Sequence, residues 1–146
     1  MNNKGVWALV IAAIITISTA VAHMSCIFLG PSCYSAQMAP QVVIQSAIDG
    51  TLIAPITTVF ISILFITCGV FALSGAGILK KLPLLKLALA SIATLCLLRG
   101  ISTLPLSLLY PDKVSMFSIS AGIVWFITGG LFMYGWICTH HVRTNH

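Results

Sequence analysis

Four long apolar stretches, separated by shorter polar segments, dominate the pattern along the chain. They cover about residues 6–24, 52–78, 83–109 and 115–138. Each is long enough to cross the roughly 30 Å apolar core of a bilayer as a helix. A segment inside lipid must satisfy its own backbone hydrogen bonds, so a helix is favoured even where β-branched residues follow one another. The pattern also lacks the two-residue alternation of a membrane β-barrel. It predicts an all-α integral membrane protein, a bundle of four transmembrane helices.

The connecting segments differ in length and in their turn residues. The segment 25–50 is long, and we expect it to form a loop on the outer side of the membrane. Within it, 40–48 has apolar residues at helical spacing, which fits either a short helix on the membrane surface or a plain linker. Gly75 and Gly77 end the second apolar stretch and Pro83 opens the third, as at the end of one helix and the start of the next. We therefore expect a tight antiparallel hairpin here.

Charged residues are too scarce for a soluble protein of this length. The 146 residues include seven Lys or Arg and two acids, so that 6% of the chain is charged. A typical soluble domain has roughly 25% charged residues. This argues against a soluble enzyme, a nucleic-acid-binding protein and a disordered chain, and the basic residues lack the interleaved aromatics of a nucleic-acid surface. We expect a single membrane domain at 1–146 whose partner is the lipid bilayer, with no nucleic acid.

The few basic residues set the expected orientation. They flank the apolar stretches mostly on one side, at Lys4, Lys80, Lys81, Lys86 and Arg143, with Lys113 as the exception. Cytoplasmic flanks of membrane helices are enriched in Lys and Arg, so both termini and the turn at 80–81 should be cytoplasmic. Lys80 and Lys81 also suit contacts with anionic lipid of the inner leaflet. The compact, charge-poor chain leads us to expect the inner membrane of a bacterium.

The first apolar stretch has a second interpretation. Ala20, Val21 and Ala22 follow it in the small-x-small order of a secretory cleavage site. Cleavage after Ala22 would leave three helices. The stretch is nearer in length to a membrane span than to the apolar region of a signal peptide, so we predict a retained helix.

Two of the five cysteines share the predicted outer segment. Cys26 and Cys33 lie on either side of a Gly-Pro turn, and in an oxidising compartment a disulfide between them is expected. A thiol oxidoreductase of the membrane is the functional alternative, but such proteins normally carry a Cys-x-x-Cys pair, which this chain lacks. A copper site built from His23, Met24 and these cysteines matches no strong ligand spacing. We predict a structural disulfide and no metal or other cofactor.

Arg99 is the most informative residue for function, because it lies near the middle of the third apolar stretch. A central arginine costs about 2.5–3.5 kcal/mol on insertion scales, and intramembrane charges usually serve a function. Gly100 beside it allows another helix to approach closely. Trp125 on the fourth stretch lies at a similar depth and could stack on the guanidinium.

Hydroxyl side chains fall at similar depth in the outer half of the predicted bundle. Thr58 and Ser62 on the second helix and Ser102 on the third would form, with Arg99 and Trp125, an outer polar pocket. The alternative is structural, because Ser and Thr are common in membrane helices and bond their own backbone or pack between helices. In that case Arg99 only clamps carbonyls or a lipid phosphate.

The function that these features predict is binding rather than catalysis. No acid lies within a predicted span, because Asp49 is expected to cap the second helix on its outer side and Asp112 follows the third. Neither a zinc-protease motif nor a Ser–His–Asp set is present. We predict a non-enzymatic membrane component that binds lipid, a small molecule or a membrane partner through the outer polar pocket. A transporter or channel subunit is one alternative, and a thiol-redox protein using Cys26 and Cys33 is another. Gly122 and Gly129, one heptad apart, predict close helix packing within the chain or in a homo-oligomer or larger complex.

Overall fold

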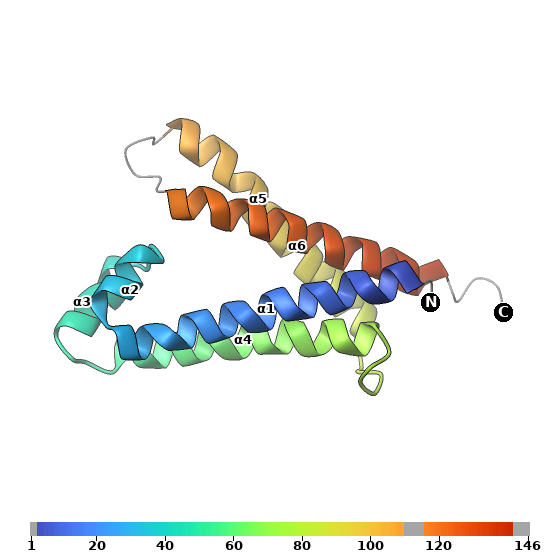
Figure 1. Cartoon of the computed structure of the whole chain (residues 1–146), viewed down its shortest axis with the longest axis horizontal. Coiled ribbons are helices and arrows are strands. Elements are labelled where there is room, and N and C mark those ends of the chain that lie inside the picture. Colours follow the sequence, from blue (N-terminus) through green and yellow to red (C-terminus); the bar gives the residue numbers. More distant parts are fainter. Residues whose placement is uncertain (1–2, 110–115, 142–146) are drawn as a thin grey trace. The chain divides into compact units, whose positions relative to one another are not determined.

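The computed structural model describes residues 3–109 and 116–141, and over these ranges its regular secondary structure is entirely helical. Six helices follow one another (Figure 1): α1 Asn3–Leu29, α2 Pro31–Ala36, α3 Gln41–Ile48, α4 Ile53–Gly75, α5 Leu85–Leu109 and α6 Met116–His141. Four of them, α1, α4, α5 and α6, are long and apolar enough to cross a membrane. The all-α class and the four apolar helices are confirmed, and they indicate a multi-pass membrane protein.

The helix ends differ from the predicted ones. α1 continues to Leu29, five residues beyond the predicted end, and α4 ends at Gly75 rather than near residue 78. Hydropathy located the ends where apolar residues stop, but the backbone of α4 ends where Gly77, with a φ of 80°, turns the chain. The predicted connection between the third and fourth helices lies in 110–115, outside the described residues.

The connection predicted at 25–50 is largely helical. After α1, Gly30 adopts a φ of 77° and Pro31 opens α2, in keeping with the predicted Gly-Pro turn. α3 then occupies Gln41–Ile48, so this part of the connection is a helix rather than an irregular linker, and its position on the membrane surface stays a prediction. The second long apolar helix begins only at Ile53.

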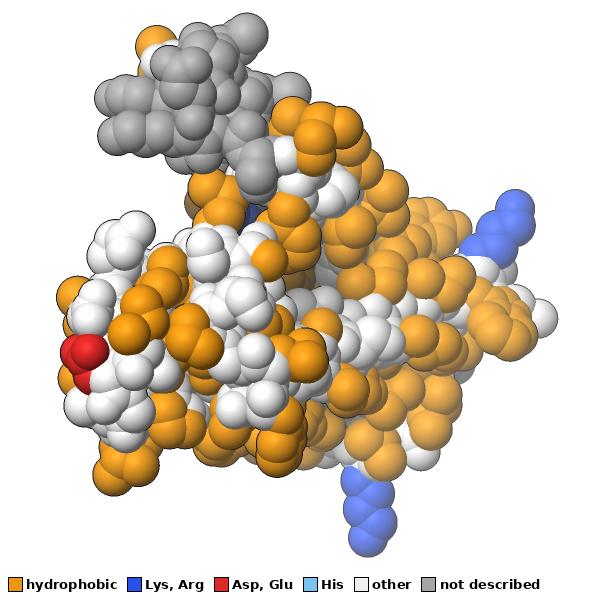
Figure 2. All heavy atoms as spheres, turned by 60° about the vertical axis from the view of Figure 1, so that its left-hand side comes forward, with side chains coloured by type: hydrophobic (Ala, Val, Ile, Leu, Met, Phe, Trp, Pro, Cys, Tyr) orange, Lys and Arg blue, Asp and Glu red, His pale blue; other side chains and the backbone are white. Residues whose placement is uncertain are grey.

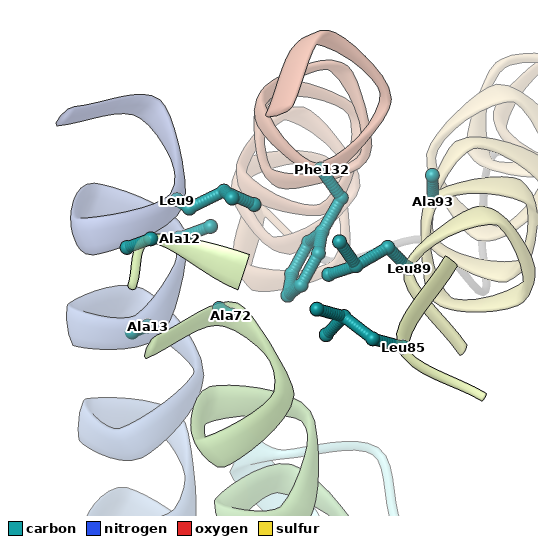
Figure 3. Close-up of a cluster of buried hydrophobic side chains, with 9 residues drawn as sticks. Leu9, Ala12, Ala13, Ala72, Leu85, Leu89, Ala93 and Phe132 are labelled. Atoms are coloured by element: carbon teal, nitrogen blue, oxygen red, sulfur yellow. The ribbon is translucent and has the colours of Figure 1, made fainter. Parts of the chain in front are cut away.

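The chain divides into two compact units. The first unit comprises 1–15 and 68–146, and the second comprises 16–67, so that α1 and α4 each run through both. The core of the first unit brings four helices together (Figure 3): Leu9, Ala12 and Ala13 of α1, Ala72 of α4, Leu85, Leu89 and Ala93 of α5, and Phe132 of α6. Small alanines line α1 and α4, so the larger leucine and phenylalanine side chains fill the space between the helices.

α5 and α6 lie side by side and touch through glycines. A Cβ atom added to Gly100 would lie 2.7 Å from the backbone nitrogen of Phe126, and one added to Gly129 would lie 2.8 Å from that of Leu97. One added to Gly122 would lie 2.5 Å from Thr103 Oγ1. The predicted close packing at these glycines is confirmed, and the contact is made within the chain.

The second unit has a small core of its own. Cys26, Tyr34 and Ala54 are buried together, with Val43 and Ile44 of α3 packed against them. The start of α4 is capped from α3, because Ser46 Oγ accepts a hydrogen bond of 2.9 Å from the backbone nitrogen of Ala54. The prediction that Asp49 caps this helix is wrong: Asp49 ends α3, and its Oδ1 accepts a hydrogen bond of 2.8 Å from Gln45 Nε2.

Apolar side chains cover most of the described surface on the face that Figure 2 presents. Many of them are large, such as Trp7 (65% exposed), Phe60 (63%) and Ile123 (57%). A water-soluble domain seldom exposes contiguous apolar surface on this scale. The surface therefore fits a lipid environment and agrees with the apolar composition of the helices.

Candidate functional site

Arg99 lies on α5 and its side chain is exposed. It is about 21 Å from the start of α5 and about 15 Å from its end, at 1.5 Å per residue. Its backbone carbonyl accepts a hydrogen bond of 3.2 Å from Thr103 Oγ1. Within the described part of the chain, the guanidinium makes no ion pair or hydrogen bond. A fixed positive charge is thus presented on the surface of an apolar helix.

The segments that carry Arg99 and Trp125 are brought together by the contact between α5 and α6. Gly100 follows Arg99, Phe126 follows Trp125, and the backbones meet at Gly100 and Phe126. Trp125 is half-buried on α6. This places the two predicted site residues in neighbouring stretches of one unit. Stacking of the indole on the guanidinium stays a prediction.

Ser102 is exposed one turn after Arg99. Its Oγ donates a hydrogen bond of 2.6 Å to the carbonyl of Leu98, four residues earlier. This is the usual way in which a serine satisfies its hydroxyl within a membrane helix. The hydroxyl keeps its lone pairs available to a ligand, but its own proton is already used.

Thr58 and Ser62 belong to the second unit, and their hydroxyls are engaged there. Thr58 Oγ1 lies 3.1 Å from Tyr34 Oη and 2.7 Å from the carbonyl oxygen of Ala54. Ser62 Oγ donates a hydrogen bond of 3.2 Å to the carbonyl of Ala20 on α1. Both side chains are buried, with 4% and 2% exposed. These bonds hold α4 against α1 and α2, and a pocket that combines them with Arg99 of the first unit stays a prediction.

Cys26 and Cys33 meet as predicted. Their sulfur atoms lie at disulfide-bonding distance, and their Cα atoms are 5.2 Å apart, within the usual range for a disulfide. Cys26 is only 1% exposed and packs with Tyr34 and Ala54. Reactive redox cysteines are partly exposed and lie in electropositive surroundings. A buried sulfur that joins α1 to α2 fits a structural role better than thiol exchange.

A pocket that the sequence did not predict opens where α4 ends and α5 begins. Its volume is about 900 Å³, and we call it the turn pocket. Residues of four helices and the turn line it, among them Val6, Ser74, Lys81, Leu85, Lys86 and Thr139. Lys80, which the sequence paired with Lys81 as a lipid contact, does not line it. The lysines could be found from their position beside the predicted turn. No feature of the sequence near Val6 or Thr139 indicates that these residues line the same pocket.

The described residues contain no group of three His, Cys, Asp or Glu side chains placed to share a metal ion. At Cys26 and Cys33 the sulfur atoms face each other at bonding distance, so they do not offer the two thiolates that a copper site with His23 would need.

Comparison with known proteins assigns no family to this chain. No family model, no curated protein and no solved structure matches it at a significant level.

Proposed function

We propose that the chain is a non-enzymatic subunit of a membrane complex, in which Arg99 binds a carboxylate carried by a membrane-spanning helix of a partner protein. The observation that carries the proposal is an exposed guanidinium well inside an apolar helix. An arginine at such depth is costly unless an anionic or polar group meets it. The free energy recovered on pairing then favours assembly.

The chain itself offers few acids for this pairing. Asp49 is the only acid among the described residues, it belongs to the second unit, and its Oδ1 is bonded to Gln45. A carboxylate matches the planar fork of a guanidinium in two parallel hydrogen bonds, which an amide or hydroxyl cannot do. A partner's intramembrane Asp or Glu is therefore the ligand that this site suits best.

The α5 surface around Arg99 is suited to a second helix. Leu95, Leu98 and Ser102 are exposed beside it and offer an apolar surface with one small polar residue. Association of helices in lipid depends on such packing together with a few interhelical polar contacts. The charge would supply specificity, and the leucines would supply contact area.

For the orientation, we propose that both termini and the turn at 80–81 are cytoplasmic, in the inner membrane of a bacterium. The support is the position of Lys4, Lys80, Lys81 and Lys86 on one side of the apolar helices. Reporter fusions after residue 34 and after residue 81 test it. An external signal from the second fusion and a cytoplasmic signal from the first would refute the orientation.

The pairing is tested with a synthetic transmembrane helix, polyleucine–alanine with one central Glu, and its Gln counterpart. The labelled full-length chain is reconstituted in phosphatidylcholine vesicles at pH 8, and binding is followed by energy transfer. The wild type should bind the Glu helix at least about tenfold more tightly than the Gln helix, because a charge-assisted pair contributes about 1.5–3 kcal/mol. Arg99→Leu should bind both helices equally.

Matched variants separate pairing from general packing. Ser102→Ala removes a neighbouring polar group and should keep the preference for Glu, because its hydroxyl bonds its own helix. Arg99→Lys keeps the charge but not the fork, and should retain only part of the preference. A wild-type chain that binds the two helices with equal affinity would refute the proposal.

A further inference from the structure

The turn pocket combines charge and apolar surface at one end of the long helices. Lys81 and Lys86 line it, and so do five leucines of the turn and of α5: Leu79, Leu82, Leu84, Leu85 and Leu87. Among the described residues that line it, none is acidic. Its volume of about 900 Å³ is in the range of pockets that hold small ligands.

The turn that forms one wall is fixed by hydrogen bonds. Ser74 is buried at the end of α4, its Oγ donates a hydrogen bond of 2.9 Å to the carbonyl of Lys80, and it accepts one of 3.0 Å from the backbone nitrogen of Leu82. Lys81 is the residue between these two anchors. These two hydrogen bonds fix the backbone of Lys81 relative to the end of α4, and so they also fix the position of its Cα atom.

The start of α5, whose residues also line the pocket, is equally well fixed. Leu84 adopts a φ of 56°, which turns the chain into α5, and its carbonyl accepts a hydrogen bond of 2.9 Å from Ala88. Lys86 follows in the first turn of α5 and is half-buried, whereas Lys81 is exposed. Lys86 thus presents its amine from a helix that is already anchored by Leu85 and Leu89 in the core.

We infer that the turn pocket binds an anionic phospholipid, whose phosphate lies between the amines of Lys81 and Lys86 and whose acyl chains lie along the leucines. Two cations with no acid among the described lining residues favour an anionic ligand. The leucine walls favour an amphiphile over a free phosphate. The site lies where two membrane-spanning helices end and begin, which is the depth of lipid headgroups. This inference does not depend on the role of Arg99.

The sequence predicts a lipid contact for both Lys80 and Lys81, and the turn pocket includes only the second of these lysines. Lys80 precedes Lys81 directly but does not line the pocket, and its carbonyl is held by Ser74. If only diffuse surface charge attracted anionic lipid, the three lysines of this region would contribute alike. Lys80 is therefore a control of the same charge and almost the same position.

The experiment measures binding of fluorescent phosphatidylglycerol to the full-length chain in phosphatidylcholine nanodiscs. Lys81→Gln and Lys86→Gln should each weaken binding about fivefold and together about thirtyfold, as expected for one favourable phosphate contact per lysine. Lys80→Gln should weaken it less than about twofold. Lys86→Arg keeps the charge and should bind like the wild type. This result would show that position 86 tolerates a substitution, so the weaker lipid binding of Lys86→Gln follows from the lost charge.

Three results would overturn the inference. Equal losses in all three single Gln variants would assign the effect to diffuse surface charge, and unchanged binding in the double variant would remove the lysines from the site. Competition with inorganic phosphate and with glycerol phosphate tests the lipid source. If either displaces phosphatidylglycerol as well as unlabelled lipid does, the ligand is the phosphate alone and the lipid assignment is wrong.

Discussion

Gly129 and Gly130 on α6 provide a direct test of the contact between α5 and α6. A Cβ added to Gly129 would lie 2.8 Å from the backbone nitrogen of Leu97 and 2.8 Å from its Cγ, whereas a Cβ added to Gly130 meets no atom within 4 Å. Because a backbone atom cannot rotate away, the two helices must separate by about 0.7 Å to restore normal contact at Gly129. Overpacking of this kind costs about 1–3 kcal/mol.

The two substitutions to Ala differ in this contact and in little else. Each replaces a glycine in the same helical turn, so the gain in helix propensity, about 1 kcal/mol, is common to both. We therefore expect Gly129→Ala to be less stable than Gly130→Ala by about 1–3 kcal/mol in the free energy of unfolding. Unfolding by SDS titration in mixed micelles, followed by circular dichroism, measures the difference.

A third variant identifies the atom responsible. Leu97→Ala removes the Cγ contact but leaves the backbone nitrogen at 2.8 Å, so it should not fully rescue Gly129→Ala. If Gly129→Ala and Gly130→Ala unfold at the same SDS fraction, α5 and α6 are not packed backbone to backbone at this glycine, and the reasoning is refuted.

Two further predictions concern the second unit. Cys26→Ser should lower the free energy of unfolding by about 2.5 kcal/mol, because it opens a short loop that the disulfide closes. A reducing agent should abolish the difference between this variant and the wild type. Cys138→Ser, the control, should have little effect on the free energy of unfolding. Ser46→Ala should cost about 1–2 kcal/mol, because it removes the acceptor of the Ala54 amide. Hydrogen exchange at that amide should accelerate, whereas exposed Ser35→Ala should leave it unchanged.

The apolar helices could be predicted from the sequence because the apolar composition and length of each are enough to identify it. A run of apolar residues long enough to span lipid needs no partner in order to be recognised. The close approach at Gly100 and Gly129 was also predictable, since only a glycine leaves room for a second backbone there. The disulfide partners Cys26 and Cys33 lie within one short segment, so their pairing could be predicted without knowing how distant parts of the chain fold.

Contacts between distant segments could not be predicted. Ser46 caps α4 from α3, and Thr58 meets Tyr34 of α2, although neither pairing follows a sequence spacing. Hydropathy treats 25–50 as a gap between spans, so it does not reveal that α3 supplies the cap that Asp49 was expected to supply. The turn pocket also depends on Val6 and Thr139, which lie at opposite ends of the chain.

Some hydroxyl groups bond only their own helix and others join two elements, and this difference bears on function. Those of Thr67, Thr94 and Ser102 are exposed and bond the carbonyl four residues earlier on their own helix. The hydroxyls of Ser46, Thr58, Ser62 and Ser74 are buried and reach another element. A chain with so few charges thus joins its segments with neutral hydrogen bonds, which avoid the desolvation cost of buried ion pairs.

It follows that a cluster of Ser and Thr at one depth is weak support for a ligand pocket in this protein. Each buried hydroxyl named above already has a partner, and removing it would first affect stability. The fixed charges are different, because Arg99, Lys81 and Lys86 are not used to join helices within the described residues. For Arg99, which lies well inside an apolar helix where a charge is costly, the charge is best explained by what it binds. Substitutions of these three residues should therefore weaken binding while leaving the free energy of unfolding nearly unchanged.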